Sequence, residues 1–497
     1  MFDKEKKCVS LVGVGPGDEK LLTVRACECI ETADVIVYDN LVNPTILNRV
    51  KMSAKLIYAG KISGNHYLTQ DKINETIAEY ALAGEYVVRL KGGDPYIFGR
   101  GGEEAEYLLE RNIDFETVHG VSSFYAGLGY AGIPVTFRGE AAEFHVFTGH
   151  KKQGEELDLN FKNIARLEGS LVFLMGISNL SLIVQGLLSN GMNSDIGAAV
   201  IENGTRYNQR VFRGKLSNIE EISKRENIIS PALIVVGDVC KKNLTFFQKH
   251  TLPLSGKNIL LTATKGLVEK MSPEFKNLGA NTCEMSLIAT KEIEIDKNTF
   301  VSQLELATHI LFTSSNGVDI FFEKIKSYDI DIRSLCNKKI CVIGSGSSDA
   351  LKKYGINADF VPSKFDSKSF LAEILPKLDK NSRVLMLRAK LGNDNLPRGL
   401  REAGIEFSDI PVYDTIIDYR RSFELNKEIK KFDYVVVASA SAVKALCEMI
   451  EDKSALLNRV VSIGPVTTKA LREFGIEELI TAKQYDVKGI VDAIKGL

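Results

Sequence analysis

The sequence predicts an α/β protein made of several lobes. Three observations predict this class: short apolar strands alternate with helical segments, glycine-rich loops follow the strands, and one pattern of strands and Ser/Thr clusters occurs twice in the second half. The chain has 497 residues, which is too long for one ordinary hydrophobic core. We therefore expect two to four domains.

The composition is typical of a globular protein and argues against several partner classes. Apolar residues make up 44% of the chain, charged residues 26%, and the formal net charge is -1, so no overall field attracts nucleic acid or an anionic membrane. No apolar stretch approaches the roughly 18 residues of a membrane span, and the first residues lead into a strand instead of a signal-peptide core. The eight cysteines form no Cys-x-x-Cys pair, so we expect free thiols, no metal site and a cytoplasmic location.

The first elements in chain order predict a parallel sheet with ligands at one edge. A strand at 9–14 runs into Gly13-Val-Gly15-Pro-Gly17-Asp18, and a helical pattern follows over 21–32. Strands at 35–38 and 55–58 then end at Asp39 and near Lys61. Ligands of parallel sheets bind at the carboxyl ends of the strands, where these residues fall. The glycine spacing differs from Gly-x-Gly-x-x-Gly, which argues against a dinucleotide site.

The segment 87–104 is the most informative loop. An apolar strand ends in Gly92-Gly93-Asp94-Pro95, and a further glycine pair precedes a helical segment. Glycine lacks a Cβ, so its peptide groups can approach a ligand closely or take a positive φ. An ordinary strand-to-helix turn is the alternative interpretation. Arg89, Arg100 and Glu103 either meet substrate groups or brace this loop.

The rest of the chain continues the alternation and then repeats it. A helix opens at 118–123, strands recur at 170–175, 197–201 and 232–236, and a polar linker follows. Two pairs of segments then match in the same order. They are 309–318 with 434–443, and 342–351 with 462–471. Two similar α/β lobes with a ligand cleft are the expected result.

Ser/Thr clusters follow the strands of both repeats, at Thr313 to Ser315, Ser345 to Ser348, Ser439 to Ser441 and Thr467 to Thr468. Hydroxyls beside the free amides of a helix N-terminus suit carboxylates or phosphates. For any one cluster taken alone, simple helix capping is the favoured interpretation. Four clusters together favour a polyanionic ligand.

The motifs of the two halves resemble two known families. Those of the first half, at residues 9–18, 33–39, 88–104 and 130–134, resemble uroporphyrinogen-III C-methyltransferases of the tetrapyrrole methylase family. Those of the second half, at residues 312–317, 396–397, 411–413 and 463–465, resemble uroporphyrinogen-III synthases. The resemblance implies an N-terminal two-lobed tetrapyrrole methylase fold followed by a two-lobed α/β uroporphyrinogen-III synthase fold.

The resemblance also implies domain limits. They are 1–245 for the methyltransferase (lobes about 1–135 and 140–245), 246–255 for the linker and 256–497 for the synthase (lobe 1 about 256–291 plus 417–497, lobe 2 about 292–416). The first half is then an S-adenosyl-L-methionine enzyme, and we expect it to form a homodimer through this domain. The residues carried over for cofactor binding are Pro16, Gly92, Gly93, Asp94, Ile97, Ser122, Ser123, Met175, Gly204 and Ala232.

The implied reactions follow one another. The synthase would cyclise hydroxymethylbilane to uroporphyrinogen III, inverting ring D and releasing water, with Tyr413 assisting departure of the hydroxyl or packing at a hinge. The methyltransferase would methylate uroporphyrinogen III at C2 and C7 to give precorrin-2, toward sirohaem or cobalamin. Asp39 would accept a proton, and Lys61 would donate one or hold a substrate carboxylate; a surface ion pair is the alternative for both. The substrate residues expected in the synthase are Thr313, Ser314, Ser315, Ser441 and Thr467.

Three positions depart from the family patterns. His119 stands in place of a usual proline, Phe137 in place of a histidine, and Thr262-Ala263 lacks an arginine that often follows the first synthase strand. A different function also fits the sequence. It is a methylase of the same fold acting on another target, such as a later precorrin, diphthine or ribosomal RNA, with the second half a regulatory module that binds a polyanion.

Overall fold

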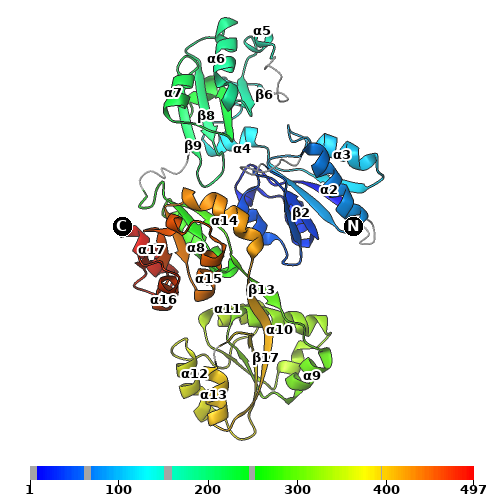
Figure 1. The fold of residues 1–497 in the computed structure, drawn as a ribbon, viewed down its shortest axis with the longest axis vertical. Helices are drawn as coiled ribbons and strands as arrows, with labels where there is room; N and C mark the ends of the chain where they lie inside the picture. Colours follow the sequence, from blue (N-terminus) through cyan, green and yellow to red (C-terminus); the bar gives the residue numbers. More distant parts are fainter. Residues whose placement is uncertain (1–7, 61–68, 150–158, 246–251, 393, 497) are drawn as a thin grey trace. The chain divides into compact units, whose positions relative to one another are not determined.

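The computed structural model describes residues 8–60, 69–149, 159–245, 252–392 and 394–496. Lys61 and residues 246–251 of the expected linker lie outside these ranges. The chain separates into two units, residues 1–286 with 420–497 and residues 287–419. Each unit contains β-sheet and α-helices, in agreement with the α/β class that the sequence predicts (Figure 1). In the described residues no helix is long and apolar enough to cross a membrane.

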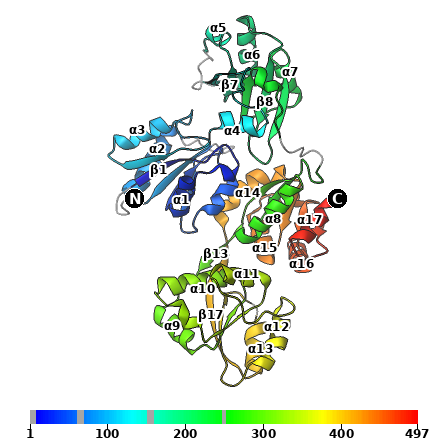
Figure 2. The same cartoon turned by 180° about the vertical axis from the view of Figure 1, so that it is seen from behind.

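The first sheet is entirely parallel, in the order β3-β2-β4-β1-β5. Its strands and helices are β1 (Cys8–Gly13), α1 (Val24–Thr32), β2 (Val35–Tyr38), β3 (Lys55–Tyr58), α2 (Gln70–Leu82), β4 (Val87–Lys91), α3 (Gly101–Leu109) and β5 (Asp114–Val118). Alternate residues of β1 face opposite sides of the sheet. Val12 packs with α1, whereas Leu11 packs with α2 and α3 on the other face (Figures 1 and 2). Helix α1 begins at Val24, later than expected, because the Thr23 hydroxyl caps it by accepting from Ala26 N at 3.2 Å.

The second sheet is mixed, in the order β6-β7-β10-β8-β9. Its elements are α4 (Ser123–Tyr130), β6 (Phe144–Thr148), α5 (Phe161–Ile164), β7 (Ser170–Leu174), α6 (Leu180–Ser189), β8 (Gly197–Glu202), β9 (Arg210–Lys215), α7 (Ile219–Arg225) and β10 (Ala232–Val236). Strand β10 runs antiparallel to both of its neighbours, and β9 runs antiparallel to β8. A short connection joins β8 to β9, and such a connection permits only antiparallel pairing. Of these two sheets, therefore, the first is parallel throughout and the second is not.

The third sheet, in the first unit, is built from two distant parts of the chain, in the order β12-β11-β18-β19-β20. Its elements are β11 (Asn258–Leu261), α8 (Lys265–Asn277), β12 (Asn281–Glu284), α14 (Ser422–Glu428), β18 (Tyr434–Val437), α15 (Ala440–Met449), β19 (Val460–Ser462), α16 (Pro465–Glu473), β20 (Ile480–Thr481) and α17 (Val487–Lys495). All strand pairs are parallel. The apolar sides of α8 and α17 pack together against one face.

The second unit holds the fourth sheet, in the order β13-β17-β16-β14-β15. Its elements are β13 (Ile288–Glu292), α9 (Lys297–Leu306), β14 (His309–Phe312), α10 (Ser315–Ser327), β15 (Lys339–Val342), α11 (Ser345–Lys353), α12 (Ser367–Ile374), β16 (Arg383–Ala389), α13 (Asn395–Glu402) and β17 (Glu406–Ile417). Helices α9 to α11 cover one face, and α12 and α13 cover the other. Only β13 pairs antiparallel within the described sheet.

The repeat predicted from the sequence is confirmed, since β14 and α10 correspond to β18 and α15, and β15 and α11 to β19 and α16. A third matching pair was missed. Asp366 caps α12 and Asp486 caps α17, and an exposed aromatic residue, Phe365 or Tyr485, precedes each cap. Short 3-10 helices complete the fold: η1 (Glu19–Leu21), η2 (Pro44–Arg49), η3 (Ile177–Asn179), η4 (Asp238–Lys241), η6 (Ile332–Leu335), η7 (Leu375–Lys377), η8 (Tyr419–Arg421), η9 (Ile429–Lys431) and η10 (Lys453–Leu456).

Candidate active sites

Three glycine-containing loops meet at the carboxyl edge of the first sheet. Gly15 and Gly93 exchange backbone hydrogen bonds of 3.2 and 2.8 Å. A Cβ on Gly13 would lie 2.7 Å from Gly93 O, and one on Gly120 would lie 2.6 Å from the carbonyl carbon of Gly13. These distances leave no room for a side chain, so glycine is required where the loops cross. Gly93 also has a φ of +72°, and its open side faces the start of α4, where Ser123 N would lie 3.9 Å from a Cβ added to Gly93.

The carboxylate of Asp94 organises this edge. Asp94 is 7% exposed and accepts hydrogen bonds from Tyr96 N at 2.8 Å and from Gly120 N at 3.1 Å. Its Oδ2 also lies 2.9 Å from Nδ1 of His119, the residue that replaces the usual proline. A proline could not make this side-chain contact. Asp94 thus ties the β4 loop to the loop before α4, and a ligand held there would meet a preformed backbone.

Three further expected cofactor residues, Met175, Gly204 and Ala232, lie where α4 meets the second sheet. Met175 follows β7 with a φ of +54°, and Ala232 begins the neighbouring strand β10. A Cβ on Gly204, after β8, would lie 3.1 Å from the Cα of Gly127 on α4. The structure therefore brings Met175, Gly204 and Ala232 to one edge of their sheet, next to the helix that Ser123 begins. The Met175 and Ile97 side chains are 47% and 41% exposed, which leaves both accessible.

Asp39 belongs to a largely buried charge network. Arg89 Nη2 donates to Asp39 Oδ2 at 2.9 Å, and Arg89 Nε donates to Glu104 Oε1 at 3.3 Å. Lys91 donates to the same Glu104 oxygen at 2.8 Å, and Gln70 does so at 3.0 Å. Burial and the Arg89 charge together lower the pKa of Lys91.

The network bears on the surface-ion-pair interpretation of Asp39. The Arg89 side chain is 4% exposed and that of Asp39 is 24% exposed, so their contact is not a surface ion pair. Arg89 orients the Asp39 carboxylate and leaves its second oxygen to accept from Leu41 N at 2.9 Å. Arg100 and Glu103 instead form an exposed pair at the start of α3, with a bond of 2.8 Å, and brace that end of the loop.

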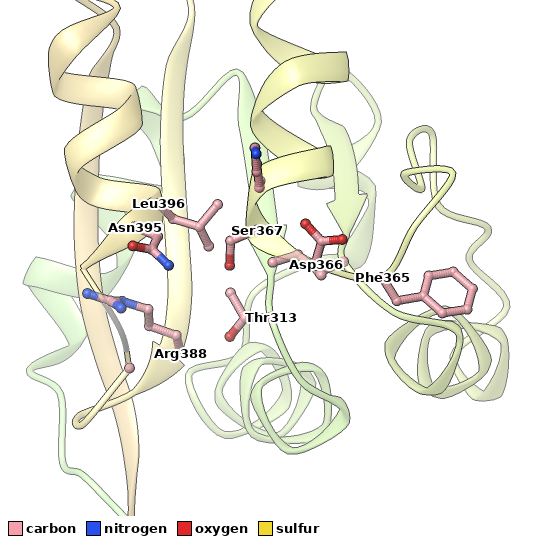
Figure 3. Close-up of a pocket in the computed structure, with 10 residues that line it drawn as sticks. Thr313, Phe365, Asp366, Ser367, Arg388, Asn395 and Leu396 are labelled. Carbon is pink, nitrogen blue, oxygen red and sulfur yellow. The ribbon is translucent and has the colours of Figure 1, made fainter. Parts of the chain in front are cut away.

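The second unit contains a cavity of about 460 Å³ (Figure 3). Its lining residues are Thr313, Ile343, Phe365, Asp366, Ser367, Lys368, Arg388, Gly392, Asn395 and Leu396. Helices α10, α12 and α13 all begin at this cavity, so the partial positive charges of three helix N-termini converge there. Figure 3 shows the Thr313 and Ser367 side chains between Arg388 and Asn395 on one side and Phe365 on the other. The arrangement suits an anion.

Arg388 is held in place by Asp409, whose Oδ1 accepts from Nε at 2.7 Å. Sequence reasoning missed Ser367, Arg388 and Asn395 at this cavity. The repeat of Phe365-Asp366 in Tyr485-Asp486 was a usable signal for the α12 loop. Arg388 and Asn395 had no such signal, because they enter the cavity from β16 and α13, outside the repeated Ser/Thr clusters.

The expected synthase residues fall into accessible and buried groups. Thr313 lines the cavity, and Ser314 caps α10 by accepting from Gly317 N at 3.2 Å. Tyr413 is 6% exposed within the core of its lobe, and its hydroxyl donates to Ser314 Oγ at 2.9 Å. Ser315 is exposed.

The first unit holds the other two residues. Ser441 is exposed, with its Oγ 3.1 Å from Ser439 Oγ, whereas Thr467 is 3% exposed on the inner side of α16. Thr468 next to it bonds inside the lobe, its Oγ1 lying 2.6 Å from Ser462 Oγ. In this lobe, therefore, only Ser441 of the two expected residues is open to a ligand.

The glycine-lined edge and the repeated lobes define a fusion of two α/β enzymes. The family model for Tetrapyrrole (Corrin/Porphyrin) Methylases matches residues 9–220, and that for Uroporphyrinogen-III synthase HemD matches residues 269–492. The chain is 37% identical to the porphyrin biosynthesis protein HemD of Ruminiclostridium josui, over 98% of this chain and 97% of that protein. The chain belongs to the family in which a tetrapyrrole methylase is joined to a uroporphyrinogen-III synthase.

Two further relatives match less of the chain. A uroporphyrinogen-III C-methyltransferase of Bacillus subtilis is 36% identical, over 70% of this chain and 71% of that protein. An S-adenosyl-L-methionine-dependent uroporphyrinogen III methyltransferase of Methanosarcina barkeri is 47% identical, over 46% of this chain and 91% of that protein. The last match covers 232 residues, which is about the length of the N-terminal half.

Proposed function

We propose that the chain catalyses two consecutive reactions. It cyclises hydroxymethylbilane to uroporphyrinogen III with inversion of ring D and loss of water, and it then methylates this product at C2 and C7 to give precorrin-2. The observation that carries the proposal is the presence of both family matches on one chain, because the product of one reaction is the substrate of the other. The regulatory alternative for the second half is not favoured, since that half matches an enzyme family.

S-adenosyl-L-methionine is the methyl donor in this proposal, as the name of the Methanosarcina relative states for that protein. When bound, it supplies an electrophilic sulfonium methyl group. The cradle fits such a group, because Gly93 presents backbone without a side chain toward the start of α4. Asp94 holds that backbone in place, and the exposed side chains of Ile97 and Met175 offer apolar contact. The ten expected cofactor residues remain our proposal for this site.

The methyltransferase residues act mainly by alignment. Pyrrole carbons of the substrate are electron-rich, so the protein has to hold carbon and methyl group in line and then remove a proton. We assign that proton to the carboxylate of Asp39, which Arg89 orients. Lys61 keeps its proposed role as proton donor or carboxylate ligand, and it lies outside the described residues.

The synthase residues bind a polyanion and assist loss of a hydroxyl. Acetate and propionate carboxylates of the bilane suit the amides and hydroxyls at the starts of α10 and α12, together with Arg388. We add Ser367, Arg388 and Asn395 to the expected set of Thr313, Ser314, Ser315, Ser441 and Thr467. Tyr413 is our proposed aid to departure of the hydroxyl, because its Oη meets Ser314 one residue from the cavity.

The proposal also includes domain limits of 1–245, 246–255 and 256–497. It further includes a homodimer formed through the methyltransferase part and a cytoplasmic location. Light scattering on the purified chain tests the dimer. Two separate assays test the reactions. Preformed uroporphyrinogen III with S-adenosyl-L-methionine should give a dimethylated product, and hydroxymethylbilane alone should give the type III isomer. Absence of methylation, or formation of type I alone, would refute the corresponding half.

A further inference from the structure

The loop that follows β2 carries Asp39 and is held from several sides within the methyltransferase part. Arg89 binds the Asp39 carboxylate, and Asn43 Nδ2 donates to Gly17 O at 2.6 Å. Arg206, which follows β8, donates to the carbonyl oxygen of Leu41. These contacts hold the start, the middle and the far end of the loop. Tyr38, the last residue of β2 before the loop, has a different partner.

That partner belongs to the synthase part of the same unit. Tyr38 directly precedes Asp39, and its hydroxyl donates to Oε1 of Glu424 on α14. Both side chains are buried, with 4% and 3% exposure. Arg421, one residue before α14, is 1% exposed and donates to Pro44 O at 2.7 Å. The residues on either side of the Asp39 loop are therefore bonded to the synthase part.

Further contacts show that α14 is firmly seated there. The Phe423 and Tyr58 rings lie 4.3 Å apart between centroids, and Tyr58 packs edge-on against Tyr38 at 5.5 Å. Tyr207 donates to Glu428 Oε2 at 3.1 Å. Beyond α14, Asn48 Nδ2 donates to Glu284 O at 2.9 Å. Both apolar packing and hydrogen bonds thus hold the two parts together.

The Tyr38–Glu424 bond is the most consequential of these contacts. A buried carboxylate is costly unless its oxygens are hydrogen-bonded. The second oxygen, Glu424 Oε2, has no hydrogen-bond partner among the described residues, so the carboxylate depends on the bond that the Tyr38 hydroxyl donates to Oε1. Burial, followed by the Glu424 charge, raises the pKa of Tyr38, which keeps its hydroxyl protonated as a donor. The bond fixes the Tyr38 ring. Because Asp39 is the next residue in the chain, the bond also restricts the position of the Asp39 backbone.

We propose that α14 of the synthase part is a positioning element of the methyltransferase, acting through the Tyr38–Glu424 and Arg421–Pro44 hydrogen bonds on the Asp39 loop. The inference rests on the proposed role of Asp39. It makes methyl transfer to preformed uroporphyrinogen III depend on a residue of the other enzyme. The methylase family model matches residues 9–220, and 91% of the Methanosarcina methyltransferase is covered by a match to only 46% of this chain. We therefore expect this contact to be a feature of the fused chain.

Full-length Glu424→Ala and Glu424→Gln test the proposal, with preformed uroporphyrinogen III and S-adenosyl-L-methionine as substrates. We expect Glu424→Ala to lower kcat by about tenfold, because a misplaced loop slows a reaction that depends on alignment, while KM for the donor changes less than about twofold. Glu424→Gln should recover most of kcat, because its amide oxygen still accepts from Tyr38. Asp319→Ala is the matched control, since Asp319 accepts from Tyr354 at 3.0 Å in the second unit. The control should leave methylation unchanged.

Cyclisation of hydroxymethylbilane by the same variants separates positioning from folding, and it should stay within about twofold of the parent. If Glu424→Ala loses both activities, the Tyr38→Phe variant distinguishes a positioning role from a general loss of folding. The proposal requires Tyr38→Phe to lower methylation alone, and equal loss of both activities overturns it. Unchanged methylation by Glu424→Ala also overturns it. Asp39→Asn tests the underlying role separately: if it is inactive while Glu424→Ala is fully active, only the brace fails, and if it is fully active, the assignment of Asp39 fails.

Discussion

Replacing Gly120 by alanine tests the loop crossing at the proposed cofactor site. The new Cβ would lie 2.6 Å from the carbonyl carbon of Gly13 and would also press on Gly93 O. Ordinary van der Waals contact begins at 3.4 Å, so relieving the contact with Gly13 alone requires a separation of roughly 0.8 Å, and the closer contact with Gly93 O requires more. Both contacts are backbone, which cannot turn aside as a flexible side chain can. Overpacking of this kind lowers the free energy of unfolding by about 1 to 3 kcal/mol.

The same separation would move Gly93 relative to the start of α4. Calorimetry on full-length Gly120→Ala should therefore show a Kd for S-adenosyl-L-methionine raised by at least about tenfold. Gly102→Ala is the matched control from the same region, because a Cβ at Gly102 meets nothing within 4 Å and alanine is favoured in a helix. A Kd for Gly120→Ala within twofold of the parent value would refute the assignment of this edge to the cofactor.

Two other perturbations probe the synthase cavity and the first sheet. Arg388→Met should raise KM for hydroxymethylbilane by about tenfold through loss of a charge-assisted contact, with methylation of preformed uroporphyrinogen III unchanged. Arg333→Met removes an exposed arginine paired with Asp331 elsewhere in that unit and should change neither activity; equal behaviour of the two variants would count against the cavity. Burial raises the pKa of Glu116, but hydrogen bonds from Arg25 and Ser10 outweigh it and hold the pKa below its ordinary value of 4.5. The stabilisation is therefore full above about pH 4.5 and is lost as the pH falls below it, so the Tm of Glu116→Gln should vary less with pH than the parent Tm between about pH 5 and 3; parallel Tm curves would contradict this linkage.

Local motifs were enough to predict the glycine loops and the capped helices. A strand that ends in Gly92-Gly93-Asp94 predicts a close approach of backbone to a ligand without any information from distant residues. In the same way, Ser314 predicts the N-terminal cap of α10. The internal repeat predicted the paired strands and helices of the two synthase lobes, because matching short segments can also be identified from the sequence alone.

Long-range pairings were out of reach. Asp39 and Arg89 meet because β2 and β4 are neighbours in the sheet, and Glu424 reaches Tyr38 across 386 positions of sequence. The cavity at Arg388 depends on three helices beginning at one place, which the spacing of residues along one chain does not reveal. The mixed second sheet was not predicted either. Strand β9 gave no strong strand signal, and the direction of β10 depends on its long-range pairing with β7 and β8.

The central claim is that one chain carries out both reactions in sequence. The most direct measurement supplies the purified full-length chain with hydroxymethylbilane and S-adenosyl-L-methionine carrying a ¹³C-labelled methyl group, and then determines the isomer and the labelled positions of the product. The account predicts a type III tetrapyrrole labelled at C2 and C7. A product that is unlabelled, or that consists only of the type I isomer, would contradict it.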